Sequence, residues 1–180
     1  MIAKAELHVH LEGTAPPDLV RRLAERHGMP VPEGLFDGDE RFAYTDFLDF
    51  LRAYDLAASV MRSGDDYRDV TYEYLASCAR DGAIYVELTA SPDHAELVGL
   101  DQQEHLEGIA RGIDDARAEF GIEGRILISA VRNFGVDRAL RVAQYAAERP
   151  HPYVVGFSMA GDEENFPAGD YVEAFEVAAG

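Results

Sequence analysis

The sequence predicts an α/β fold in which about four parallel strands form the first half of an eight-stranded (β/α) barrel of the TIM type. Short apolar runs rich in β-branched residues alternate with longer stretches at helical spacing, which is typical of repeated βα units. Each apolar run is followed by a helical stretch, as parallel strands require. The first run carries polar side chains on one face, and this favours a barrel over a small open sheet.

The strands and helices are expected in the following order. The first strand covers residues 6–13, and a helix from Pro17 to His27 follows, because proline is favoured at a helix start and Gly28 lies just past its end. Helical insertions after this strand are predicted at 45–61 and 65–80. The remaining elements are a strand at 84–89, a helix at 102–120, a strand at 125–131, a helix at 136–148, a strand at 153–159 and a helix from 170.

Length and composition indicate a single domain that spans residues 1–180. Hydrophobic residues make up 47% of the chain, enough for a substantial core. The 34 acidic residues outnumber the 16 basic ones and give a net charge of -18, so we expect no binding of nucleic acid and no attraction to an anionic membrane. The composition therefore favours a small-molecule partner.

The predicted compartment is the cytoplasm. The N-terminus lacks the apolar core of a signal peptide, and no later stretch reaches the ~20 apolar residues of a membrane span. The chain has one cysteine, Cys78, which has no internal partner for a disulfide and is expected to fill the core.

The first strand separates its polar side chains from its apolar ones. Successive side chains of a strand point to opposite faces, so the polar and apolar residues that alternate along this segment lie on opposite faces. The polar face carries Glu6, His8, His10 and Glu12, and the apolar face carries Ala5, Leu7, Val9 and Leu11.

Two histidines at i and i+2 on one face can converge on a divalent metal, for which imidazole is a common ligand. The alternative is that this face is exposed to water, since paired histidines also occur in strands without any metal. We expect the apolar face to be buried, which directs the polar face toward an enclosed site or solvent.

Four motifs together resemble the adenosine deaminase family of metal-dependent amidohydrolase barrels. They are KAELHVHLEGT at 4–14, YVEL at 85–88, SP at 91–92 and VGFSMAGDE at 155–163. Their order and spacing are similar to those of the family, and the resemblance extends over essentially the whole chain. It implies that the chain is the N-terminal half of such a barrel.

The resemblance implies roles for individual residues. His8 and His10 match the first two ligands of a single Zn²⁺, and His10 also counts among the substrate-binding residues. Glu12 matches an acidic residue that contacts the sugar or, in adenine-specific relatives, shapes the pocket beside the base. Gly161 matches a glycine whose backbone amide contacts the purine, where a side chain would prevent close approach.

Three apolar residues, Phe47, Leu48 and Leu51, resemble the lid over the substrate, although their spacing is also that of any core helix. Glu87 is expected to have a structural role. His94 follows the second strand and is a weak candidate for a metal ligand, whereas the histidines at helix ends and turns, His27, His105 and His151, are expected to be solvated.

The function that the resemblance implies is zinc-dependent hydrolytic deamination of adenosine or 2′-deoxyadenosine to inosine or 2′-deoxyinosine and ammonia. A deaminase for adenine or another aminopurine metabolite of the same family is the first alternative. An inactive half-barrel that self-associates through its open sheet edges, or binds a partner there, is the second.

The same resemblance places the general acid glutamate and the other zinc ligands beyond Gly180. The present residues therefore include no catalytic group, and the isolated 180-residue chain is expected to be inactive.

Overall fold

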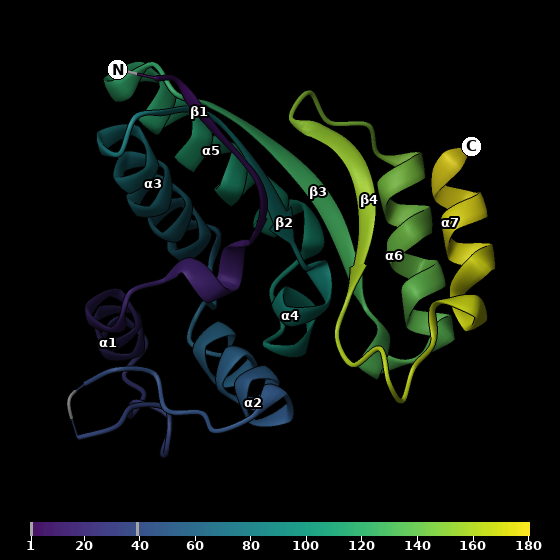
Figure 1. The fold of residues 1–180 in the computed structure, drawn as a ribbon, viewed down its shortest axis with the longest axis horizontal. Helices are drawn as coiled ribbons and strands as arrows, with labels where there is room; N and C mark the ends of the chain where they lie inside the picture. Colours follow the sequence, from purple (N-terminus) through teal and green to yellow (C-terminus); the bar gives the residue numbers. More distant parts are fainter. Residues whose placement is uncertain (1, 39) are drawn as a thin grey trace.

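A computed structural model describes residues 2–38 and 40–180 of the protein. Its strands are β1 (Lys4–His10), β2 (Ala83–Ala90), β3 (Glu123–Val131) and β4 (Val154–Ala160). They form one parallel sheet in the spatial order β1-β2-β3-β4 (Figure 1). Because each strand is added beside the preceding one, the sheet grows in one direction, as half of a (β/α) barrel requires. The predicted fold class is confirmed.

The helices form two groups (Figure 1). One group packs along the sheet: α3 (Gly64–Arg80), α5 (Gln102–Phe120) and α6 (Val136–Glu148), with α7 (Val172–Ala179) packed against α6. The other group lies toward the carboxyl ends of the strands: α1 (Pro17–Arg26), α2 (Phe47–Ala58) and α4 (Pro92–Leu97). Short 3₁₀ segments are η1 (Leu11–Thr14), η2 (Arg132–Phe134) and η3 (Ala168–Tyr171). In the described residues, no helix is both long and apolar enough to cross a membrane.

The core lies between the two central strands and the helices that cover them. Val86 and Leu88 of β2 and Ile126 of β3 are fully buried in it. Helices α3 and α5 approach each other closely at Gly108, where a Cβ atom would lie 2.2 Å from the carbonyl oxygen of Gly64. A side chain at this position would separate the two helices that close the core.

The first strand differs from the sequence prediction in two ways. It ends at His10 rather than at residue 13, because η1 begins at Leu11. Its apolar face is also not uniformly buried, since the side chain of Leu7 is 60% exposed. The physical reason is that β1 is an edge strand, and α1 lies at the end of the sheet instead of over it (Figure 1).

A buried carboxylate, Asp66, fixes the start of α3. The backbone amides of Arg62 and Ser63 donate hydrogen bonds to its Oδ2 atom at 2.8 and 2.9 Å, which completes a capping box with Ser63. Arg26 donates to Oδ1 at 2.7 Å, and Nε2 of His27 lies 2.6 Å from Oδ2. His27 is therefore held by α3, and the expectation that it is solvated is wrong.

The charge of Asp66 depends on these partners. Burial alone would raise its pKa, but the hydrogen bonds from His27, Arg62, Ser63 and Arg26 lower the pKa below the ordinary aspartate value. Since the folded-state pKa is the lower one, the stabilisation is complete above about pH 4 and is lost as the pH falls through the folded-state pKa.

We predict that Asp66→Ala lowers the free energy of unfolding by about 3 kcal/mol, because the substitution removes the acceptor of two part-buried backbone amides and one of the two acceptors of Arg26. The matched control is Asp69→Ala, which removes a partner of Arg26 whose side chain is 28% exposed. The control should lose less than about 1 kcal/mol. Urea unfolding followed by circular dichroism measures both, and equal losses would contradict the role given to Asp66.

Candidate active site

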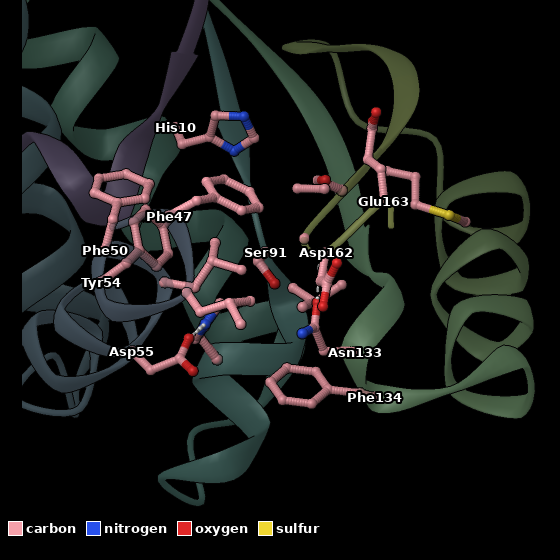
Figure 2. A pocket seen from close by; sticks show the side chains of 18 of the residues that line it. His10, Phe47, Phe50, Tyr54, Asp55, Ser91, Asn133, Phe134, Asp162 and Glu163 are labelled. Carbon is pink, nitrogen blue, oxygen red and sulfur yellow. Dashed lines mark hydrogen bonds and ion pairs between the residues drawn. The ribbon is translucent and has the colours of Figure 1, made fainter. Parts of the chain in front are cut away.

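A cavity of about 600 Å³ opens at the carboxyl ends of the strands, between α2 and the segment after β4 (Figure 2). Active sites of (β/α) barrels lie at this end. Six of the seven residues that the sequence analysis selected line this cavity: His8, His10, Phe47, Leu48, Leu51 and Gly161. The structure therefore brings together residues that are up to 153 positions apart in the sequence, from His8 to Gly161.

The two imidazoles of β1 face the cavity together. His8 and His10 have ring centroids 5.5 Å apart, as expected for alternate residues of one strand face. The ring of Tyr54 from α2 meets His10 edge-on at 6.4 Å. Burial lowers the pKa of His10 below the ordinary histidine value, which favours the neutral form that binds a metal.

These two imidazoles fit part of a zinc site. In the ranges 2–38 and 40–180, no group of three or more His, Cys, Asp and Glu side chains is arranged to hold a metal ion. A catalytic zinc ion needs three protein ligands and an open position. His8 and His10 can supply two of the nitrogen ligands, and a complete site requires more donors than the described residues bring together.

Glu12 lies beneath the cavity rather than in its lining, and its side chain is fully buried. The hydroxyl of Tyr54 donates to Oε2 at 2.6 Å, and the backbone amide of Ser91 donates to Oε1 at 2.9 Å. Nε2 of His105 is 3.9 Å from Oε1. Because η1 begins after His10, the alternation of the strand does not continue, and Glu12 turns inward toward α2 and β2.

The partners of Glu12 keep it ionised. Burial alone would raise its pKa, but the imidazoles of His105 and His94 and the hydroxyl of Tyr54 lower the pKa to about 2. Burial and the nearby Glu12 carboxylate also raise the pKa of Tyr54 well above its ordinary value, so this hydroxyl stays protonated and donates. His105 is completely buried, and the expectation that it is solvated is wrong.

Helix α2 forms one wall of the cavity. It begins after Asp46, whose side chain accepts a hydrogen bond from the backbone amide of Asp49 at 2.8 Å. Phe47 and Leu48 are 55% and 57% exposed although they line the cavity, so these two side chains do not belong to a helix core. Their position agrees with an apolar lid, and contact with a substrate stays a prediction.

The opposite wall is the segment that follows β4. Gly161 has φ +108°, and a Cβ atom there would lie 2.2 Å from Oδ1 of Asn133. The backbone amide of Asp162 donates to that same oxygen at 2.9 Å. Arg132 is buried and donates to the carbonyl of Phe166 at 3.0 Å, which holds the far end of the segment.

Sequence reasoning missed Ser91 and Asn133 as cavity residues and Arg132 as the residue that holds this wall. All three come directly after β2 or β3, where the carboxyl end of a barrel strand meets the active site. Their position directly after a predicted strand is the feature of the sequence that could have identified them.

Two other candidates have local partners. His94 lines the cavity, is 5% exposed, and its Nε2 lies 2.9 Å from Oδ1 of Asp55. In the part of the chain that is described, His94 does not join His8 and His10 in a group that could hold a metal ion. Glu87 accepts a hydrogen bond from the Tyr85 hydroxyl at 2.9 Å and lies outside the cavity lining, in agreement with a structural role.

Comparison with known proteins identifies the family. The family model described as adenosine deaminase matches residues 3–180. The chain belongs to the adenosine deaminase family. Among curated members, it is 43% identical to the adenine deaminase of Agrobacterium fabrum over 177 residues, which are 98% of this chain and 54% of that protein. It is 44% identical to the adenine deaminase of Mesorhizobium japonicum over 178 residues, or 99% of this chain and 54% of the relative.

Two solved structures have the same fold as this chain. The adenine deaminase of Arthrobacter aurescens superimposes with a TM-score of 0.87 at 27% identity, over 97% of this chain and 54% of the other. A zinc-bound amidohydrolase from Burkholderia ambifaria gives a TM-score of 0.85 at 24% identity, over 99% and 49% of the respective chains. The chain therefore spans about half the length of the relatives it matches.

We predict that Gly161→Ala destabilises the wall opposite α2, because the added Cβ atom meets the side chain that holds Asp162. The control is Gly99→Ala, at φ +81° with no atom within 4 Å of the added Cβ. The control adds only backbone strain of about 1 kcal/mol, and Gly161→Ala should cost about 2 to 3 kcal/mol. Thermal unfolding compares them, and a smaller loss for Gly161→Ala would show that the contact with Asn133 is unimportant.

Proposed function

We propose that this chain supplies half of the active site of a zinc-dependent adenine deaminase, which hydrolyses adenine to hypoxanthine and ammonia. The motifs of the sequence imply a nucleoside substrate, adenosine or 2′-deoxyadenosine, with adenine as an alternative. The names of the curated relatives favour that alternative. The residues 1–180 would form part of a single barrel domain.

The observation that carries the choice of adenine is the burial of Glu12. An acidic residue at this position would have to present an oxygen to the cavity in order to bind a ribose hydroxyl. Here one carboxylate oxygen accepts from the Tyr54 hydroxyl and the other from the amide of Ser91, and the side chain is fully buried. Glu12 therefore offers no acceptor to a sugar, which supports a free base as the substrate.

The residues of this chain have separable tasks in the proposed reaction. His8 and His10 hold the metal through neutral imidazole nitrogens. A bound zinc ion would supply an activated water nucleophile at neutral pH for attack at C6 of the purine. The backbone at Gly161 admits the ring closely because it carries no side chain, and Phe47 exposes an apolar surface that excludes water from the opposite side.

The proposal assigns the proton donor, expected to be a glutamate, and the remaining metal ligands to the part of the protein that this chain does not contain. In consequence, the 180-residue chain alone should release no ammonia and should hold less than one zinc ion per chain. A tightly held stoichiometric zinc ion would require another ligand from the described residues, with His94 the first candidate.

The test is ammonia release by the full-length protein from adenine, adenosine and 2′-deoxyadenosine. We expect kcat/KM for adenine to exceed that for either nucleoside by at least about 100-fold, because the added sugar finds no paired polar groups. His10→Ala should abolish the activity and lower the zinc content. His151→Ala, at a residue outside the cavity, serves as control. A preference for adenosine, or activity retained by His10→Ala, would contradict the proposal.

A further inference from the structure

We propose that the cavity selects its purine by charge, and that exposed carboxylates on its walls exclude phosphorylated and other anionic aminopurines while neutral ones are admitted. This inference rests on the proposed function and adds a charge criterion to it. The exposed carboxylates of the lining belong to Asp46, Asp55, Glu163 and Glu164. The first two lie at the start of α2 and within it, and the last two lie on the opposite wall, in the segment after β4.

The acidic and basic side chains of the lining are unequally represented. Among the described residues that line the cavity there is no lysine and no arginine, and the remaining carboxylate, on Asp162, is buried. The side chains of Asp55 and Glu163 are 56% and 78% exposed, and Figure 2 shows them on opposite sides of the cavity. Walls that carry charges of one sign focus their field into the cleft between them. An anion in this cavity therefore meets a negative potential from both sides.

Two guanidinium groups behind the lining are already engaged. Arg132 is buried, and its Nη2 atom donates to the Glu163 carboxylate at 3.2 Å. Arg138 lies over the ring of Phe134 and donates to Oδ1 of Asp93 at 2.6 Å. A phosphate group is usually bound by arginine or lysine side chains that are free to pair with it. Neither of these two arginines is free in this way.

Charge divides the aminopurines into two groups. Adenine is neutral near pH 7, whereas a nucleotide adds a phosphate with a charge of about -1.5 to -2. The same purine ring is present in both, so contacts with the ring alone do not separate them. Repulsion between like charges acts at a distance and requires no contact with the base. The carboxylates of the walls therefore supply a criterion that the apolar side chains of α2 do not.

Two of the four carboxylates can be neutralised with little change in structure. Within residues 2–38 and 40–180, the carboxylate of Glu164 has no hydrogen bond or ion pair, and only its backbone amide is used. Asp46 accepts the hydrogen bond from the amide of Asp49 at 2.8 Å that caps α2. Asparagine caps a helix as well as aspartate does, so Asp46→Asn removes the charge and keeps the cap.

The test uses two ligands of equal size that differ in charge, adenine-9-acetic acid and adenine-9-acetamide. Their dissociation constants for the full-length protein are measured by calorimetry, which requires no turnover. We expect the neutral amide to bind the wild type at least about tenfold more tightly than the anionic acid. Raising the salt concentration from about 0.05 M to about 0.5 M should reduce this ratio, because the Debye length becomes shorter.

The variants place the charge on particular residues. Glu164→Gln and Asp46→Asn should each reduce the ratio by about threefold, and Glu164→Lys should reduce it by about tenfold. The control is Glu148→Gln, which makes the same change of net charge as Glu164→Gln at an exposed residue at the end of α6, outside the cavity. This control should keep the wild-type ratio. All proteins are compared at equal zinc content, so a change in the ratio reports the carboxylates.

The outcomes separate this inference from the proposed function. Equal dissociation constants for the acid and the amide in the wild type, or binding of neither ligand, would overturn the selection by charge. The same ratio in Glu164→Lys and in Glu148→Gln would overturn it as well. If the full-length protein releases no ammonia from adenine, the proposed function fails instead, and the calorimetric comparison still decides whether the cavity rejects anions.

Discussion

The buried carboxylate of Glu12 joins the elements that surround the cavity. Through the Tyr54 hydroxyl it holds α2, through the amide of Ser91 it holds the end of β2, and through the nearby imidazole of His105 it meets α5. Glu12 itself lies in η1, two residues after His10. A single charged group therefore fixes α2 relative to the strand that carries the imidazoles.

This arrangement separates support from recognition. The polar groups of Glu12 are used inside the protein, so the cavity presents mainly aromatic and aliphatic side chains on the α2 side. Polar residues of the lining, among them Ser129 and Asn133, lie instead at the end of β3. An apolar wall facing a few oriented polar groups is the usual composition of a small-molecule site.

The parts of the structure that the sequence predicts are those set by local periodicity. The four strands, the long helices and the shared face of His8 and His10 follow from spacing within single elements. The burial of Glu12 could not be predicted in this way, because a 3₁₀ turn replaces the strand after His10. Helix α4 has six residues, too few for a periodic pattern.

Other features depend on pairs that are distant in the sequence. The contact between Asn133 and Asp162 joins residues 29 positions apart and arises only when β3 and β4 lie side by side. His105 is a different case, because the sequence held the signal. It precedes Ile109 by four residues and so shares the apolar face of α5, which indicates a buried imidazole.

The most direct test of this account is hydrogen exchange in Tyr54→Phe, which removes one hydroxyl and keeps the aromatic ring. We predict that the amides of α2 exchange about tenfold faster, since the hydrogen bond from Tyr54 to Glu12 is lost. The amides of α6 and α7, which do not contact Glu12, should keep their wild-type rates. Unchanged exchange throughout α2 would contradict the claim that Glu12 fixes this helix.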